Sequence, residues 1–173
     1  MIDKLKLVPY NDPILHQPCE KFDFKNPQFD IINFSYKMVD AMRENRGLGL
    51  AANQVGYPYK IFVLQSSPIY CVINPKILHV SDEMITLEEG CLSYPGLLVK
   101  VKRPLWIKVR FNNPNGSAQT LRFEGMTARC FLHEMTHING ESWKDYVSKL
   151  ELEMSLKKCN KKTGIKYNLS NFR

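Results

Sequence analysis

The sequence has no long apolar run. Nothing in its 173 residues approaches the roughly eighteen consecutive apolar residues that a membrane-spanning helix needs. Residues 1–20 lack both the apolar core and the small-residue cleavage site of a secretory signal peptide. Internal repeats, low-complexity tracts and linkers that would divide the chain are also missing. These absences predict a single-domain, cytoplasmic, monomeric protein with no membrane partner.

Cysteine is too sparse for a disulfide scaffold. The chain has five cysteines, an odd number, and they are scattered widely along it. Small secreted scaffolds are much denser in cysteine, so reduced thiols are expected here. Most of them should be buried as small hydrophobic groups, and at most one or two should take part in chemistry.

Positive charge is concentrated at the end of the chain. The 24 Lys and Arg residues exceed the 17 Asp and Glu residues, which gives a net charge of +7. Between Lys149 and Arg173 there are seven basic and two acidic residues, and 7 − 2 leaves +5. Such a segment either contacts a phosphate-rich surface or is a solvated terminus. We therefore predict a main domain over residues 1–148 and a short basic helix or tail over 149–173.

Hydrophobic spacing predicts three helices, over residues 28–45, 126–139 and 149–158. The prolines within residues 9–20 should hold that segment extended along the surface. Short runs rich in β-branched and aromatic residues predict strands over 60–65, 69–73, 76–80, 97–102, 105–111 and 118–123.

The turn signal Asn113–Gly116 joins two of these strands and favours antiparallel pairing. The strands are grouped and do not alternate with helices. This order is typical of an α+β fold with antiparallel sheets.

The strongest local motif is H-E-x-x-H, over His133–His137. Each helical residue turns the chain by about 100°, so two residues four apart project from nearly the same face. Both imidazoles can therefore share a metal ion, with Glu134 beside them as a possible base. Two ordinary surface histidines on a helix would give the same pattern.

A third ligand does not follow in the usual protease position. The metzincin pattern would place a histidine where this chain has Trp143, and no histidine follows His137. Cys91 is an alternative, because a thiolate is a good ligand for a divalent transition metal. It lies in Glu88–Gly96, whose glycines and proline prescribe a tight backbone path.

Residues Gly47–Gly56 form a glycine-rich segment with the sequence GLGLAANQVG. Its glycines allow a ligand to approach the backbone closely, and Gln54 adds an amide donor. The segment lacks the Lys-Ser/Thr of a phosphate loop and the third glycine of a dinucleotide site. A plain loop between two elements is the other interpretation.

These three segments resemble the motifs of the peptide deformylase family. The family patterns G-x-G-L-A-A-x-Q, E-G-C-L-S and H-E-x-D-H correspond to Gly47–Gln54, Glu89–Ser93 and His133–His137, in the same order and with similar spacing. The resemblance covers about residues 8–158. It implies an α+β fold in which antiparallel sheets pack around a central metal-binding helix. One residue departs from the pattern, since Thr136 stands where the family has aspartate.

The resemblance also implies an activity, namely hydrolysis of the N-formyl group from the formylmethionine of nascent peptides. Cys91, His133 and His137 would bind one divalent metal ion, with ferrous iron expected as the native ion and zinc, nickel or cobalt also suited to the ligands. Glu134 would be the general base.

The same resemblance suggests further roles. Gln54 and the Leu92 backbone N–H would stabilise the oxyanion, and Arg103 and Thr136 would orient the metal ligands. Independently of the resemblance, the charge of the basic tail predicts that it reaches ribosomal RNA. Substrate-binding positions would be Gly47, Leu48, Gly49, Leu50, Glu89, Gly90, Arg129 and Cys130.

Three charged residues near the metal helix leave alternatives open. Glu89 and Arg103 form either a pair that braces the Cys91 loop or a surface salt bridge of little weight. Arg129 faces the metal side of its helix, so it should extend to the pocket rim or pair with an acid such as Glu88. It then either shapes substrate selectivity or is a bystander.

Two other functions remain to be separated from deformylation. A zinc peptidase would share the H-E-x-x-H helix. A non-enzymatic protein that binds RNA or the ribosome could use the basic tail, but it would not need Cys91, Glu134 or the two histidines.

Overall fold

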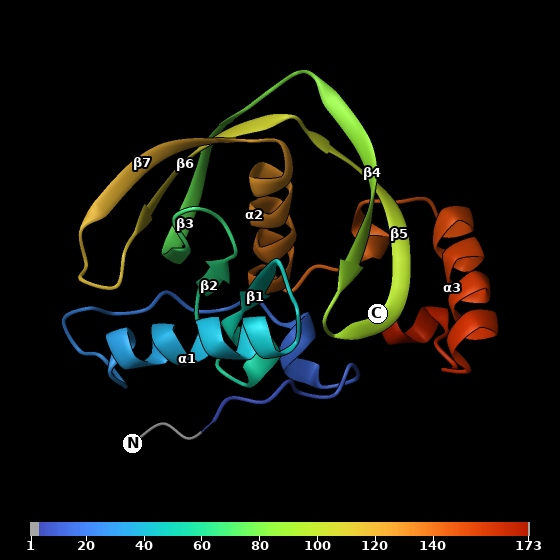
Figure 1. Ribbon diagram of the computed structural model, residues 1–173, viewed down its shortest axis with the longest axis horizontal. Coiled ribbons are helices and arrows are strands. Elements are labelled where there is room, and N and C mark those ends of the chain that lie inside the picture. Colours follow the sequence, from blue (N-terminus) through green and yellow to red (C-terminus); the bar gives the residue numbers. More distant parts are fainter. Residues whose placement is uncertain (1–3, 173) are drawn as a thin grey trace.

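Two antiparallel sheets flank the helix α2 (Gly125–Ile138). The computed structural model, which describes residues 4–172, places α2 between a five-stranded sheet and a two-stranded hairpin (Figure 1). The strand order of the larger sheet is β1-β2-β3-β6-β7, and all strand pairs are antiparallel. Its strands are β1 (Gly49–Ala51), β2 (Ile61–Leu64), β3 (Tyr70–Val80), β6 (Trp106–Asn112) and β7 (Ala118–Glu124). The predicted α+β class is confirmed.

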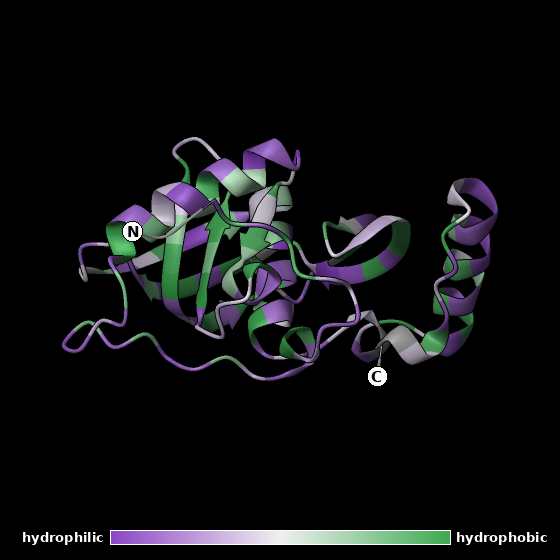
Figure 2. Cartoon of the chain, turned by 90° about the horizontal axis from the view of Figure 1, so that it is seen from below, coloured by the Kyte–Doolittle hydropathy of each residue, from purple (hydrophilic) through white to green (hydrophobic). Residues whose placement is uncertain are grey.

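The larger sheet is covered on both faces. Along β2, Ile61 and Val63 pack into the cluster under α1 (Ile31–Glu44), whereas Phe62 and Leu64 pack into the cluster under α2. Successive strand residues point to opposite faces, so one short strand supplies both cores. Figure 2 shows apolar residues gathered on the sheet and on the helix faces that meet it.

The first helix is shorter than predicted. We expected residues 28–45, but α1 begins after Asp30, whose carboxylate accepts the backbone N–H groups of Ile32 and Asn33. A capping aspartate satisfies the first free N–H groups and therefore fixes the start. The segment 9–20 is also not extended throughout, because a 3₁₀ turn (η1, Pro13–His16) interrupts it.

The strand predictions were wrong in three places, the first being the short strand β1, which was not predicted. Residues 69–73 and 76–80 are one strand, β3, because a bulge with Asn74 at φ 51° carries the chain past Pro75. The strand β4 (Met84–Cys91) was not predicted at all. Nearly all its residues are exposed, so it has no alternation of apolar and polar positions.

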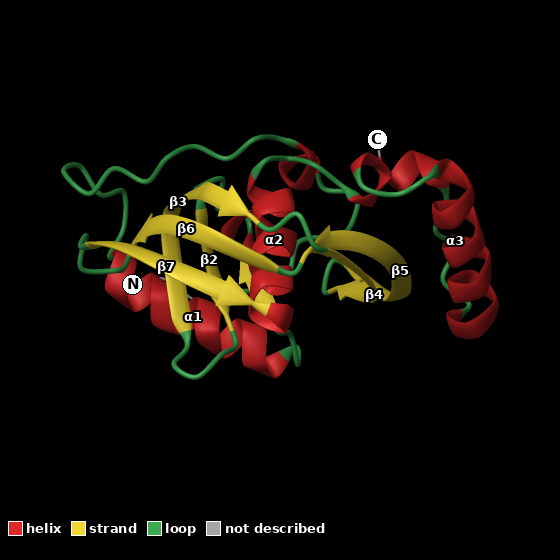
Figure 3. Ribbon diagram, turned by 90° about the horizontal axis from the view of Figure 1, so that it is seen from above, coloured by secondary structure: helices red, strands yellow, loops and turns green. Residues whose placement is uncertain are grey.

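Strand β4 pairs with β5 (Tyr94–Pro104) to form a hairpin inserted between β3 and β6. The hairpin lies between α2 and α3 (Lys149–Thr163), as Figure 3 shows. Leu152, Leu156 and Cys159 of α3 join the core under β5.

Helix α3 extends beyond the predicted end at residue 158. The buried stripe continues to Cys159, and the chain leaves the helix at Gly164 in the left-handed conformation. The division at residue 148 stays a prediction. The remaining elements are the 3₁₀ turns η2 (Ala52–Val55), η3 (Trp143–Asp145) and η4 (Leu169–Phe172). None of the described helices is both long and apolar enough to cross a bilayer.

Candidate active site

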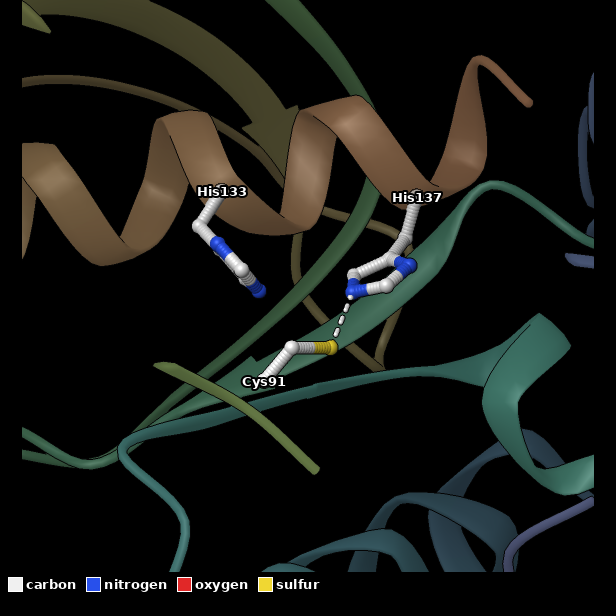
Figure 4. A group of neighbouring side chains, drawn as sticks. All are labelled: Cys91, His133 and His137. Carbon is white, nitrogen blue, oxygen red and sulfur yellow. Dashed lines mark hydrogen bonds between the residues drawn. The ribbon is translucent and has the colours of Figure 1, made fainter. Parts of the chain in front are cut away.

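One cysteine and two histidines converge from two separate elements. His133 and His137 extend from one face of α2, and Cys91 faces them from the end of β4 (Figure 4). One ligand atom from each residue lies within 4.8 Å of the others, and the Cys91 Sγ is 3.1 Å from the His137 Nε2. The expected convergence of the two motifs is therefore present in the fold.

Alternation along β4 aims Cys91 at the helix. Cys91 lies two residues after Glu89, whose carboxylate contacts His133 of α2, and residues two apart on a strand point to the same side. The register shifts between Gly90, which pairs with Leu98, and Cys91, which pairs with Tyr94, so the extra residues lie on β5. Burial raises the pKa of the Cys91 thiol to about 12, and the charge of Glu134 adds to this, although hydrogen bonds from Ser93 oppose it. Without a nearby cation the thiol therefore keeps its proton.

Glu89 orients the first histidine. Its carboxylate binds Arg103 through two contacts, of 2.7 Å to Nε and 2.9 Å to Nη2, and its Oε2 lies 3.2 Å from the His133 Nδ1. Burial alone would raise the pKa of Glu89, but hydrogen bonds from His133 and Arg103 and the Arg103 charge lower it to about 2. An ionised carboxylate only accepts hydrogen bonds, so the His133 Nδ1 must donate. The Nε2 lone pair is left for a metal ion.

The Glu89–Arg103 pair is not a surface salt bridge. Both side chains are buried, at 4% and 3% exposure. The geometry therefore fits the interpretation in which the Glu89–Arg103 pair braces the Cys91 loop.

His137 is neutral in this environment. Burial lowers its pKa well below the usual value, and electrostatic interactions with His133 and Arg103 lower it further. Its backbone is also held, because the Asn53 side-chain amide donates to the His137 carbonyl at 2.8 Å. A neutral imidazole with a fixed backbone is suited to metal binding.

Glu134 carries a buried oxygen with no protein partner. Its Oε2 is inaccessible to solvent and makes no hydrogen bond within residues 4–172. Burial raises the pKa of Glu134 well above its usual value, and the Glu89 charge adds to this while Arg103 opposes it. Buried polar atoms normally have partners, so such an atom beside the histidines marks a place for a water or a substrate group.

Gly49 on β1 leaves the space that the Glu134 carboxylate occupies. A Cβ built at Gly49 would lie 2.8 Å from the Glu134 Cδ and closer still to its Oε1. The close approach, and not a special backbone angle, requires glycine here. Nothing in the glycine-rich motif itself indicates that Gly49 faces the Glu of another motif.

We expect Gly49→Ala to displace the Glu134 carboxylate and to lower kcat by roughly 10²-fold, the usual cost of a 1 Å misplacement at a catalytic group. Gly90→Ala is the matched comparison, because its Cβ would meet the flexible end of Leu98 at 3.2 Å and the Leu97 carbonyl only at an ordinary contact distance of 3.7 Å. Steady-state kinetics on both variants, with folding checked by circular dichroism, makes the measurement. Equal losses for the two variants would show that the Gly49 contact with Glu134 has no special weight.

Gln54 lies next to the cysteine, in the turn η2. Its Nε2 donates to the Ser93 Oγ at 2.9 Å and faces the Cys91 Sγ at 3.5 Å, and its Oε1 accepts the Ala51 N–H at 2.9 Å. The amide thus reaches the site, but one of its two hydrogens is taken by Ser93. Sequence reasoning missed Ser93 as a contact, although it is the last residue of the E-G-C-L-S motif.

A cavity of about 630 Å³ opens in front of Cys91 and His133, whereas His137 is not part of its lining. Besides Cys91, Gln54, Leu92, His133 and Glu134, the predicted substrate-binding residues that line it are Gly47, Leu48, Gly49, Glu89, Gly90, Arg129 and Cys130. Residues that were not predicted complete the wall, among them Leu98 and Met126, which are exposed. Arg103 and Thr136 lie outside this cavity.

Two sequence predictions about the cavity need correction. Leu50 does not line it, because alternation on β1 turns its side chain into the core under α1. Arg129 neither extends to the rim nor pairs with Glu88. It is 3% exposed and its Nη1 binds the Glu89 Oε1 at 2.7 Å.

The donor set suits one divalent transition-metal ion. It combines a thiol sulfur with two imidazole nitrogens, a mixture that such ions prefer over oxygen-only sites. The unpartnered Glu134 oxygen beside these donors is where a water at an open coordination position would need a base. Fold and site together are those of a metal-dependent hydrolase.

Comparison with known proteins gives the family. The profile described as polypeptide deformylase matches residues 4–153. The peptide deformylase of Brucella suis biovar 1 (strain 1330) is 36% identical over 164 residues, which cover 90% of this chain and 91% of that protein. That of Wolbachia pipientis subsp. Culex pipiens (strain wPip) is 36% identical over 168 residues, 86% of this chain and 94% of that protein.

Solved structures agree. A peptide deformylase from Synechococcus elongatus, in complex with actinonin, superposes with a TM-score of 0.85 at 31% identity and covers 100% of this chain and 96% of its own. The Thermotoga maritima peptide deformylase gives 0.79 at 32% identity, over 85% of this chain and 99% of its own. The chain belongs to the polypeptide deformylase family.

Proposed function

We propose that the chain hydrolyses the N-formyl group of peptides that begin with formylmethionine and releases formate. The observation that carries the proposal is the convergence of Cys91, His133 and His137 at the cavity, with the unpartnered oxygen of Glu134 beside them. An N-terminal methionine is apolar and unbranched, and the cavity in front of these residues is large enough to take it.

Cys91, His133 and His137 would hold one divalent metal ion. Ferrous iron is the proposed native ion, and zinc, nickel and cobalt also suit one thiolate and two imidazoles. Such an ion supplies Lewis-acid chemistry that polarises a carbonyl oxygen and acidifies water at neutral pH.

Glu134 is the proposed general base. Its free oxygen takes the proton from the attacking water, and the carboxylic acid then gives that proton to the departing amine nitrogen. Burial raises the pKa of Glu134, and a raised pKa favours the acid form that carries the proton to the amine. Space for the carboxylate comes from Gly49.

The backbone around the site would hold the substrate. The Leu92 N–H and the Gln54 amide are the proposed donors to the oxygen that gains charge, and Gln54 has one hydrogen on the side of the cysteine. Strand β1 pairs with β2 only and is therefore an edge of the larger sheet. An extended peptide can add to that edge through main-chain hydrogen bonds.

Formate release separates deformylation from its rivals. A formyl-Met-Ala-Ser peptide should yield formate and the free peptide, whereas the same peptide without the formyl group should remain intact. Cleavage of internal peptide bonds would favour the zinc peptidase. No turnover together with no bound metal would favour a non-enzymatic role.

The lysines of α3 are proposed to contact ribosomal RNA during co-translational processing in the cytoplasm. Lys157, Lys158, Lys161 and Lys162 are all exposed on this helix. Replacing the four by glutamine should weaken ribosome binding in sedimentation. It should also flatten the salt dependence, by about 0.9 in the log–log slope for each phosphate that the variant no longer neutralises.

The control for this experiment replaces four exposed lysines outside α3, namely Lys6, Lys21, Lys25 and Lys76, and so makes the same change in net charge. Both variants should deformylate a short peptide at the wild-type rate. Equal ribosome binding by the two variants would exclude α3 as the contact.

A further inference from the structure

The metal donors come from two parts of the fold, a hairpin and a helix, that no strand pairing connects. Cys91 belongs to the β4–β5 hairpin, and His133 and His137 belong to α2. Among the described strands, the hairpin is not hydrogen-bonded to the five-stranded sheet. The distance from the thiol to the imidazoles therefore depends on the contacts that join the hairpin to α2.

Arg129 makes the shortest of the polar contacts between α2 and the hairpin. Its Nη1 donates to the Glu89 Oε1 at 2.7 Å and to the Val101 carbonyl at 3.0 Å, and its Nη2 donates to the Ile85 carbonyl at 2.6 Å. All three acceptors belong to β4 or β5, so one side chain of the helix binds both strands. Both Nη1 hydrogens are used, which leaves that nitrogen none for a peptide in the cavity.

The other arginine reaches α2 only weakly. The Arg103 Nη1 is 3.4 Å from the Leu132 carbonyl and 3.5 Å from the Thr136 Oγ1, both at the limit for hydrogen bonds. The Thr136 hydroxyl already donates to the Leu132 carbonyl at 3.0 Å. The family motif has an aspartate at this position, and a carboxylate there would face Arg103 and form an ion pair.

We propose that Arg129 is a positioning residue that holds the β4–β5 hairpin against α2 and so sets the distance between Cys91 and the two histidines. Position 136 is a threonine in this chain, so Arg129 provides the ionic contact between α2 and the hairpin that an acid at position 136 could also make, through Arg103. The part that concerns the metal ion rests on the proposed function.

Glu89 connects Arg129 to His133, because its carboxylate contacts both side chains. Its Oε1 is shared by Arg129 and Arg103, while its Oε2 binds Arg103 and faces the His133 Nδ1. Without Arg129 the carboxylate keeps Arg103 as its ionic partner, so its charge stays compensated. The hairpin then has no such link to the helix, and the Ile85 and Val101 carbonyls each lose a donor.

Four full-length variants test this compensation: Arg129→Met, Arg129→Lys, Thr136→Asp and the double variant Arg129→Met/Thr136→Asp. Arg129→Met should lower the urea midpoint of the metal-free protein and weaken Co²⁺ binding roughly 10- to 100-fold in chelator competition, the usual cost of losing a group that orients metal ligands. Arg129→Lys keeps the charge but loses the three-way contact, so it should also bind Co²⁺ more weakly.

The double variant should recover most of both losses, because the carboxylate introduced by Thr136→Asp restores an ion pair between α2 and the hairpin through Arg103. Its Co²⁺ absorption spectrum should return to the wild-type form, which a general change in stability would not produce. The matched control is Arg122→Met on β7. This arginine is exposed, pairs with the exposed Glu124 and stacks over the Trp106 ring at 4.2 Å. None of these residues is a metal donor, so its loss should leave Co²⁺ affinity unchanged.

Three results would overturn the proposal. Tighter Co²⁺ binding by Arg129→Met would mean that the arginine acts only by repelling the cation. If Arg129→Met left the Co²⁺ affinity and the urea midpoint unchanged, Arg129 would not hold the hairpin against α2. Failure of Thr136→Asp to rescue would deny the compensation. If the wild-type chain bound no metal ion, the proposed function would fail, but the urea midpoints of the metal-free variants would still test the contact between hairpin and helix.

Discussion

The Glu134→Gln variant should lose at least about 10²-fold in kcat on a formylated peptide, the usual scale for removal of a general base, while it retains the metal ion. Glutamine has almost the same shape, so it fits beside Gly49 as the carboxylate does. It cannot take a proton from water at neutral pH. The change therefore removes the proposed proton transfer and leaves the Cys91, His133 and His137 donor set in place.

The measurement combines steady-state formate release with metal analysis of the same sample. Glu124→Gln is the control, because this glutamate is exposed at the start of α2, outside the cavity, and its replacement makes the same change of charge. Wild-type turnover by a metal-loaded Glu134→Gln protein would exclude Glu134 as the base. A loss of metal in that variant would instead assign the carboxylate a part in holding the ion.

The helix that carries the histidines was predictable because its evidence is local. Two histidines four residues apart share a face of any α-helix, and Gly140 ends the helical pattern. The third donor was different. No periodicity relates Cys91 to His133, more than forty residues later. Thiolate chemistry could offer Cys91 as a candidate, and the resemblance to a family then placed it with the histidines.

The environment of Arg129 could not be predicted, since it depends on a strand that the sequence does not reveal. Glu88 and Glu89 are adjacent, and successive residues of a strand face opposite sides. Once β4 pairs with β5 from Met84 to Gly90, Glu89 is turned inward and buried, while Glu88 stays exposed. Local sequence could name an acidic partner for Arg129 but could not decide between two neighbours.

The same limit applies to Leu50 and Gly49. The motif marks both as part of one glycine-rich segment, but β1 pairs with β2 and its alternation sends Leu50 into the core. Gly49 is needed because Glu134, from a distant helix, fills the space where its side chain would be. Contacts between motifs require the tertiary structure.

Cys91→Ser should abolish tight metal binding, and with it nearly all deformylation. A serine hydroxyl stays protonated at neutral pH, whereas a thiol loses its proton to a bound transition metal and becomes a soft, charged ligand. The loss should be large because the two remaining donors, His133 and His137, are neutral imidazoles and supply no compensating charge. His133→Ala and His137→Ala should fail in the same way.

Cys130→Ser is the matched control for this variant. Cys130 also lines the cavity and is half-buried, but it does not belong to the group of converging donors. Equilibrium dialysis against Co²⁺ or Zn²⁺ should therefore give one ion per chain for Cys130→Ser and much less than one for Cys91→Ser, with both proteins folded. Full occupancy in Cys91→Ser would remove the thiol from the ligand set. Two histidines would then be the remaining donors. Full occupancy would therefore also require a further donor, which the described residues do not place at the site.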